Sequence, residues 1–144
     1  MPYITKEKFN IGDLSRDASP EYVVVIAEPE YFLAKLYEKY LSERGFGVRH
    51  FRSGYELHDF LTLDAPDAVL LNPGTYSTTS QVGESIKKIA RLLPRVRIIT
   101  ISYDTTPEDL KYFISAGITS HINRKLGRPR DVAEVVRAVL HGNN

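Results

Sequence analysis

The stretch Tyr22-Val23-Val24-Val25-Ile26-Ala27 decides the fold of this chain. Its unbroken run of β-branched and apolar side chains is typical of a strand buried on both faces, because a strand with one solvated face alternates apolar and polar residues. Four further short stretches are predicted as strands from their length and composition. They are Phe46–Phe51, Asp67–Leu71, Val96–Ile101 and Ile118–Asn123.

A stretch with helical spacing follows each predicted strand. Apolar residues recur there three and four positions apart, which predicts an amphipathic helix with one buried face. The residues that set this spacing are Phe32, Leu33, Leu36, Tyr37, Tyr40 and Leu41; Leu57, Phe60 and Leu61; Ile86, Ile89, Ala90 and Leu93; Leu110, Phe113 and Ile114; and Val132, Val135, Val136, Val139 and Leu140.

Capping residues mark where two of the helices begin. Ser53 and Glu56 match the capping box, in which the Ser oxygen accepts an early helix N–H and the Glu side chain reaches back. Thr106-Pro107 begins the fourth helix, because a proline at the first helical position sacrifices no hydrogen bond. Both signals place a helix directly after a predicted strand.

Breaks between the elements are equally clear. Gly45 and Gly117 stand where a helix ends in a left-handed residue. Asn72-Pro73-Gly74 ends the third strand with turn chemistry, and the Ser- and Thr-rich stretch Thr75–Gln81 is predicted as a loop. Pro129 begins the last helix.

Strand and helix thus alternate five times, with no internal repeat. Such alternation requires right-handed crossovers and a parallel sheet covered by helices on both faces. We expect an α/β, doubly wound (βα)5 flavodoxin-like fold with strand order 2-1-3-4-5. We expect residues 21–144 to form this domain and residues 1–20 to form an N-terminal arm, loose or packed on its surface.

Composition excludes several classes of protein. The 144 residues suffice for one domain, and 42% hydrophobic side chains suffice for a core. The absence of cysteine excludes disulfides and thiolate chemistry, and the net charge of +1 excludes a strongly basic coat. The longest apolar runs, Val23–Ala27 and Ala68–Leu71, are far shorter than the ~18 residues of a membrane span. With no apolar signal core near Met1, we expect a soluble cytoplasmic protein that does not bind membranes.

Function in a sheet of this kind is found just beyond the carboxyl ends of the strands. The residues there are Ala27-Glu28-Pro29-Glu30, Asn72-Pro73-Gly74, Ser102-Tyr103-Asp104 and Arg124-Lys125-Leu126-Gly127-Arg128. No nucleophile and base can be paired among them, and the four histidines of the chain lack metal-ligand spacing. We therefore expect neither an enzyme nor a metal site.

Several stretches together resemble the receiver domain of bacterial response regulators, the regulators of two-component systems. Gly45-Phe46-Gly47-Val48 and Ser53-Gly54-Tyr55-Glu56 are similar to the family's second strand and the start of its second helix. Pro66–Leu71 is similar to the run before its phosphorylation site. Ile98–Ser102 and Gly117–Ile122 are similar to the strand that ends in the switch Ser or Thr and to the segment before Lys-Pro. Their order and spacing make the resemblance specific.

The resemblance covers about residues 21–141 and implies a phosphorylation pocket. In the family, acidic residues after the first strand and an Asp after the third hold Mg²⁺, and that Asp accepts the phosphoryl group. A Ser or Thr and a Lys contact the phosphoryl oxygens. The matching positions here are Ala27, Glu28, Asn72, Ser102 and Arg124.

Two of these positions lack the required atoms. Ala27 offers no ligand, and the amide of Asn72 is not an anionic oxygen nucleophile. Pro73 also removes the backbone N–H that deamidation of Asn72 would need. Since Mg²⁺ prefers carboxylate oxygens, we expect no cofactor and no tight Mg²⁺ binding.

Each of these residues also has a structural interpretation. Asn72 suits a turn, and Ser102 is a switch residue or only an inherited remnant. Glu28 caps the first helix or pairs with Arg124. His121 stands where the family has its rotating aromatic switch, or it is a half-buried strand histidine.

A basic cluster lies between the fifth strand and the last helix. Helix N-termini attract anions, so Arg124, Lys125 and Arg128 form a candidate anion-binding site, unless the cluster is only a solvated charged face. We expect no nucleic-acid binding, because the sequence shows no wider basic stripe.

We therefore expect a pseudo-receiver that acts through phosphorylation-independent protein contacts. The resemblance implies a two-component or phosphorelay pathway, with a histidine kinase, another regulator or an output protein as the partner. It also implies a partner or homodimer face on the helix that begins at Pro107, the strand Ile118–Asn123 and the last helix, which begins at Pro129. The exposed candidates there are Glu108, Lys111, Tyr112, Arg124, Arg130 and Glu134. The alternative function is an anion or small-ligand sensor that uses the basic cluster.

Overall fold

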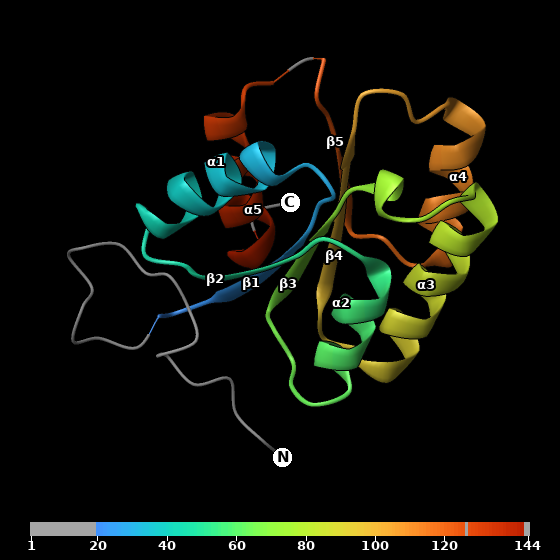
Figure 1. Cartoon of the computed structure of the whole chain (residues 1–144), viewed down its shortest axis with the longest axis horizontal. Coiled ribbons are helices and arrows are strands. Elements are labelled where there is room, and N and C mark those ends of the chain that lie inside the picture. The colour runs from blue at the N-terminus through green and yellow to red at the C-terminus, as the bar shows by residue number, and fades with distance from the viewer. Residues whose placement is uncertain (1–19, 126, 143–144) are drawn as a thin grey trace.

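Figure 1 shows the fold as a computed structural model, which describes residues 20–125 and 127–142. The N-terminal arm predicted for residues 1–20 lies outside the described residues, apart from Pro20. No helix in the described part of the chain combines the length and the apolar character that crossing a membrane requires.

Five parallel strands form one sheet in the order β2-β1-β3-β4-β5, which confirms the predicted fold. The strands are β1 (Val23–Ala27), β2 (Gly47–Phe51), β3 (Ala68–Leu71), β4 (Arg97–Ser102) and β5 (Ser120–Asn123). Their register pairs Ala27 with Leu71, Leu71 with Thr100, and Ser102 with Asn123. The carboxyl ends of four neighbouring strands therefore meet at one edge of the sheet.

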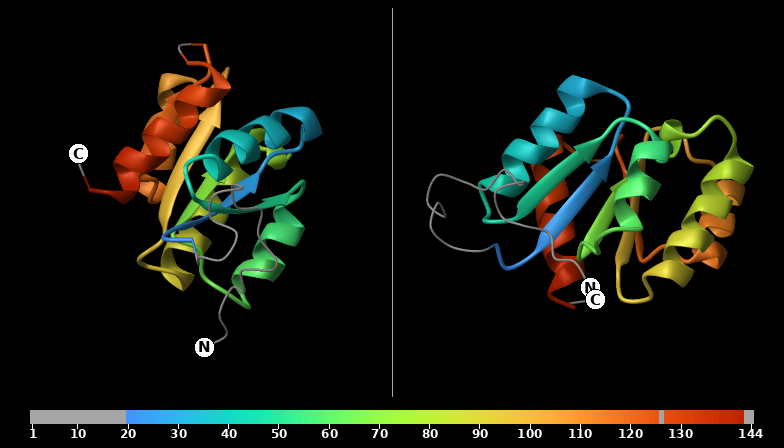
Figure 2. Two further views of the ribbon diagram at one scale, coloured as in Figure 1. Left: turned by 90° about the vertical axis from the view of Figure 1, so that its left-hand side faces the viewer. Right: turned by 60° about the horizontal axis from the view of Figure 1, so that its bottom comes forward.

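Helices cover both faces of this sheet, as Figure 1 and Figure 2 show. On one face lie α1 (Tyr31–Ser42) and α5 (Pro129–Leu140). On the other lie α2 (Gly54–Leu61), α3 (Thr79–Leu92) and α4 (Pro107–Ala116), with the short 3-10 turn η3 (Pro73–Thr75) at the strand ends.

Alternate residues of the central strands supply the two cores. Val24 and Ile26 pack against α1 and α5, whereas Val25 and Ala27 pack towards α2 and α3. Each such aliphatic side chain contributes roughly 1.5–3 kcal/mol when it is fully buried. The continuous apolar run of β1 thus serves both layers, as the sequence predicts.

The predicted starts and ends of the helices are largely confirmed. Gly45 and Gly117 have φ of 87° and 131°, where residues with a Cβ are strained. Thr106 caps α4 by accepting the Asp109 N–H. The predicted capping box at Ser53 is half present, since Ser53 Oγ accepts the Glu56 N–H but the Glu56 carboxylate accepts the Ser53 hydroxyl and no backbone N–H.

The predicted buried positions of three helix residues and the predicted start of one helix are wrong. Ile114 is 58% exposed and Phe32 79% exposed, and Leu36 is exposed as well. In α1 the buried stripe consists of Leu33, Ala34, Tyr37 and Leu41, so Phe32 and Leu36 lie at its margins. The predicted loop over 75–81 ends early, because Thr78 and Gln81 form a capping box that begins α3 at Thr79.

Candidate functional site

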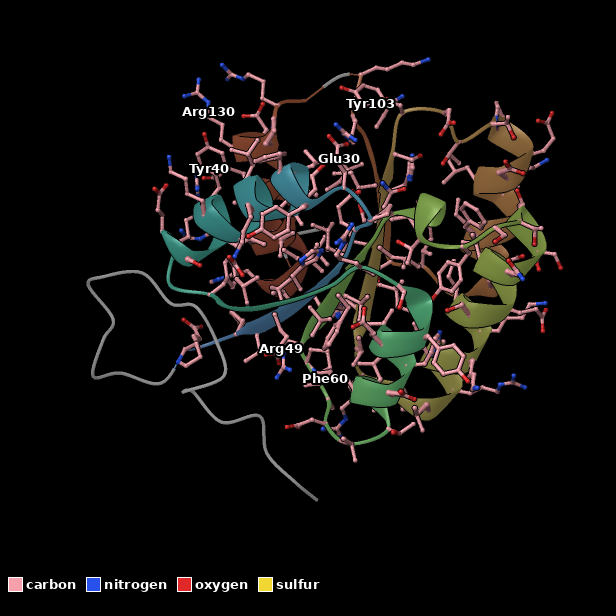
Figure 3. The ribbon with its side chains drawn as sticks, viewed as in Figure 1. Glu30, Tyr40, Arg49, Phe60, Tyr103 and Arg130 are labelled. Carbon is pink, nitrogen blue, oxygen red and sulfur yellow. The ribbon has the colours of Figure 1, made fainter. Side chains whose placement is uncertain are left out.

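The five positions predicted for a phosphorylation pocket are brought to one edge of the sheet. Backbone hydrogen bonds extend the sheet there: Asn72 N–H donates to the Ala27 carbonyl at 2.9 Å, and Arg124 N–H to the Ser102 carbonyl at 3.0 Å. Glu28 follows Ala27 directly, so all five surround the ends of β1, β3, β4 and β5. Figure 3 labels Glu30 and Tyr103 at this edge.

Asn72 and Glu28 form the centre of this site. The Asn72 amide nitrogen Nδ2 donates to Glu28 Oε1 at 2.9 Å, and Asn72 Oδ1 accepts the Gly74 N–H at 2.8 Å. The second oxygen of Glu28 accepts the Glu30 N–H at 3.0 Å. Because Glu28 is only 1% exposed, the bonds with Asn72 and Glu30 replace the water that a buried carboxylate loses.

Glu28 serves the start of α1 and does not pair with Arg124. Glu30, whose N–H it accepts, is the N-cap residue of α1. Ion pairs within 4 Å among the described residues do not join Glu28 to Arg124. The Arg124 guanidinium instead lies over the Tyr103 ring, 4.1 Å from its centroid, in cation–π geometry.

The loop after β3 is tied down along its length. The Thr75 hydroxyl donates to the Ala27 carbonyl at 3.2 Å, across to β1. Tyr76 extends over α2, where a Cβ on Gly54 would overlap its ring. The Tyr76 hydroxyl lies 2.5 Å from Ser85 Oγ on α3. Asn72, Thr75 and Tyr76 therefore fix this segment against three neighbouring elements.

The two predicted switch residues are both engaged. Ser102 is 5% exposed, and its hydroxyl is hydrogen-bonded to that of Thr105. His121 is half-buried on β5, and its Nδ1 lies 2.8 Å from the hydroxyl of the fully buried Thr100. Burial lowers the pKa of His121, because desolvation disfavours the imidazolium.

Two of the three predicted anion-binding residues contact neighbouring side chains. Arg124 is stacked on Tyr103, and Lys125 is exposed. Arg128 pairs with Asp131 through its Nε at 3.3 Å, and its backbone N–H donates to the same carboxylate at 3.0 Å. These bonds with Arg128 lower the pKa of Asp131. The Asp131 carboxylate lies in the first turn of α5.

The predicted partner face is only partly exposed. Glu108, Lys111 and Arg130 are exposed. The prediction that Tyr112 is exposed is wrong, because its ring packs on Gly83 of α3, where a Cβ would overlap it. Glu134 is exposed, but it pairs with Arg44 at 2.8 Å, on the side of α5 that faces α1.

Sequence reasoning missed the polar cluster formed by His58, Tyr76 and Ser85. One signal was present: Ser85 is a hydroxyl residue directly beside Ile86 on the predicted buried stripe. Its partners come from α2 and from the loop after β3, at separations of 27 and 9 residues. Periodicity carries no information about such contacts.

A hard cation such as Mg²⁺ does not fit the donors at the strand ends. Glu28 is the carboxylate at their centre, and both of its oxygens already accept hydrogen bonds. Ala27 has no donor atom, and the Asn72 oxygen accepts the Gly74 N–H. Across residues 20–125 and 127–142, no three His, Cys, Asp or Glu side chains gather in a way that would hold a metal ion.

Comparison with solved structures finds close similarity of fold. A CheY-like receiver domain protein from Methanospirillum hungatei superposes with a TM-score of 0.77 at 18% identity, covering 86% of this chain and 96% of that one. An orphan response regulator of Helicobacter pylori gives 0.75 at 16% identity, covering 83% and 97%. The isolated receiver domain of RcsB from Salmonella enterica gives 0.73 at 19% identity, covering 85% and 90%.

No model of a protein family matches the sequence, and no curated protein matches it. The similarity to solved structures extends over nearly the whole length of those chains. The chain therefore has the receiver fold of two-component response regulators.

Proposed function

We propose that this chain is a pseudo-receiver, which signals through protein contacts without being phosphorylated. The observation that carries this proposal is the bond between Asn72 and Glu28. Asn72 stands at the position that the receiver resemblance assigns to the phosphoacceptor Asp, and its amide is held between Glu28 and the Gly74 N–H.

Phosphoryl transfer to this position lacks a nucleophile. An amide nitrogen has its lone pair delocalised into the carbonyl, and here it donates its hydrogen to a carboxylate. Pro73 blocks the backbone route that would convert Asn72 to Asp. The proposal therefore does not depend on which phosphodonor is present.

The groups that would stabilise a phosphoryl group are also committed elsewhere. Arg124 is stacked on Tyr103, and the Ser102 hydroxyl is bonded to Thr105. Phosphoryl transfer depends on preorganised cations and donors aimed at the transferred oxygens. Here the Arg124 guanidinium and the Ser102 hydroxyl each contact a neighbouring side chain instead, which supports a resting shape without a phosphoryl ligand.

We propose a protein partner from a two-component pathway: a histidine kinase, another regulator or an output protein. Its docking face is α4, β5 and α5, which also suits a homodimer. Glu108, Lys111 and Arg130 are exposed there and carry both signs of charge. β5 is an edge strand, and His121, Ile122, Asn123 and Val135 line a hollow beside it. A patch with interspersed charges around apolar residues is typical of transient protein interfaces.

The alternative function, an anion sensor, has less support from the geometry. Arg128 is neutralised by Asp131, and that carboxylate already accepts an N–H at the start of α5. Of the three predicted anion-binding cations, Lys125 alone is exposed with neither an ion pair nor a stacked ring among the described residues.

An amide NMR titration with Mg²⁺ and beryllofluoride tests the pseudo-receiver. We expect the signals of Glu28, Asn72, Ser102 and Arg124 to stay unchanged, and we expect no acid-labile label from ³²P-acetyl phosphate. An active receiver domain serves as the positive control in both assays. Saturable shifts with Mg²⁺ at Glu28 and Asn72 would overturn the proposal.

A further inference from the structure

A groove separates α2 from α3, away from the proposed docking face. Its volume is about 760 Å³. One wall is α2, with Tyr55, His58 and Asp59; the other is α3, with Glu84 and Lys88. Figure 1 shows the loop after β3 at one end of these two helices. Groups of this groove play no part in the function proposed above.

The base of the groove contains the cluster of His58, Tyr76 and Ser85. His58 Nε2 lies 2.5 Å from Ser85 Oγ and 3.1 Å from the Tyr76 hydroxyl, and the two hydroxyl oxygens are 2.5 Å apart. His58 and Tyr76 line the groove, while Ser85 is buried beneath them. One imidazole and two hydroxyls thus form a closed triangle of short contacts.

This triangle always leaves one donor unused. If Nε2 of His58 accepts from Ser85, Tyr76 donates to Ser85 and the proton on Nδ1 is left over. If Nε2 carries the proton, it donates to one of the two hydroxyl oxygens and can no longer accept. The contact between Ser85 and Tyr76 then uses one hydroxyl proton, and the other is left over. His58 Nδ1 makes no hydrogen bond with any described residue, and the hydroxyls of Tyr76 and Ser85 make none with described residues outside the triangle. The cluster therefore suits a ligand that accepts a hydrogen bond.

Three charged side chains line the groove, the carboxylates of Asp59 and Glu84 and the ammonium of Lys88, and Lys88 is the one that can attract an anionic acceptor. Burial is the main cause that lowers the pKa of His58, and the nearby Lys88 ammonium lowers it further. The Asp59 carboxylate offsets only part of this decrease. Glu84 is paired with Lys87 at 3.2 Å. Lys88 makes no ion pair with any residue in the described part of the chain. Its charge is therefore free to meet a ligand.

The rim of the groove adds an apolar surface. Tyr55 is 83% exposed at the edge, and the Tyr76 ring, packed on Gly54, forms the wall beside the η3 loop. We propose that this groove binds a small organic carboxylate with an aromatic or aliphatic body. Its carboxylate lies between Lys88 and the cluster of His58, Tyr76 and Ser85, and its body lies against Tyr55.

Such a ligand would contact α2, α3 and the loop after β3 at once. That loop is the segment through which Asn72 and Thr75 reach β1. Binding would therefore stabilise the segment that carries the degenerate acceptor position. The proposal stands independently of the docking function, since it uses different residues.

An NMR titration with benzoate tests the site. We expect saturable shifts at Tyr55, His58 and Tyr76, and a rise in the pKa of the His58 imidazole, because a bound carboxylate favours the imidazolium. Benzamide has the same shape without the charge, and we expect it to bind at least about tenfold more weakly. Inorganic phosphate serves as the probe for the basic cluster after β5.

Two variants locate the carboxylate. Lys88→Met should weaken benzoate binding about tenfold, whereas Lys125→Met, also at an exposed lysine, should leave it unchanged. Equal binding of benzoate and benzamide, an unchanged His58 titration, or shifts centred on Arg124 would overturn the proposal. Absence of any saturable shift would overturn it as well, and none of these outcomes bears on phosphorylation or docking.

Discussion

The Asn72 side-chain amide donates a hydrogen bond of 2.9 Å to the carboxylate of Glu28, which is almost entirely shielded from solvent. The same amide accepts the Gly74 N–H through its oxygen. One side chain thus satisfies a buried charge and caps the turn after β3. Asparagine does both because it carries a donor and an acceptor on one planar group.

Asn72→Asp should destabilise the protein at pH 7. The change removes the N–H donor and places a second carboxylate against Glu28, so we expect a loss of about 3 kcal/mol in the free energy of unfolding. Urea unfolding measures it. Mg²⁺ should recover part of the loss in this variant and add nothing to the parent, because two facing carboxylates suit a hard cation.

Asn123→Asp is the matched control for that change. Asn123 is exposed, and its Oδ1 accepts the Lys125 N–H, which a carboxylate does equally well. We expect an effect within about 0.5 kcal/mol. If the Asn72→Asp variant were as stable as the parent, the bond to Glu28 would not have the role assigned to it.

Gly54→Ala should be destabilising although it lies in a helix. Replacing glycine by alanine ordinarily stabilises a helix interior by about 0.5–1 kcal/mol, and Gly54 is the first residue of α2. At Gly54 the new Cβ would overlap the Tyr76 ring, so we expect a net loss of about 2 kcal/mol in thermal or urea unfolding. In a Tyr76→Ala background the same change should become neutral or stabilising.

Gly127→Ala controls for the general effect of adding a methyl group. Gly127 is exposed, and the nearest atom to an added Cβ is 3.9 Å away, on Asp131. We expect little change in stability. A loss at Gly54 that persists without the Tyr76 ring would refute the packing explanation.

Stability should fall as the pH drops below about 6.5. Burial lowers the pKa of both His58 and His121 from the ordinary value of 6.5. Between the folded and the unfolded pKa, the unfolded chain binds more protons, so the free energy of unfolding rises with pH through that window. Urea unfolding at several pH values measures the slope, and His58→Gln and His121→Gln should each reduce it.

The imidazole titrations give an independent check on this slope. NMR of the two side chains should show both midpoints below 6.5. A midpoint at or above that value for either histidine would contradict the burial of its neutral form.

Charge reversal at Glu108 on α4 should weaken partner binding, whereas charge reversal at Glu134 on α5 should not. Glu108→Lys changes an exposed residue of the proposed docking face and should reduce capture of the partner in a pull-down. Glu134→Lys makes the same change in charge, but that side chain is paired with Arg44 towards α1, so binding should persist. Equal effects of the two variants would place the docking face elsewhere.

The order of elements follows from local features of the sequence. The apolar run of β1, the Thr106-Pro107 start of α4 and the glycines at 45 and 117 act through the backbone and near neighbours. The strand order could also be predicted from the sequence, because alternating strands and helices permit few topologies. The place of the candidate site was predictable for the same reason, since parallel strands end at one edge.

Only the tertiary structure decided which partner each polar side chain has. Arg124 stacks on Tyr103 although Glu28 is nearby along the same edge, and Glu134 pairs with Arg44, 90 residues away. His58 meets Ser85 and Tyr76 only because α2, α3 and the loop after β3 converge on one face. Backbone preferences act over a few residues and are written in the local sequence. Side-chain pairing depends on distances between elements that packing alone sets.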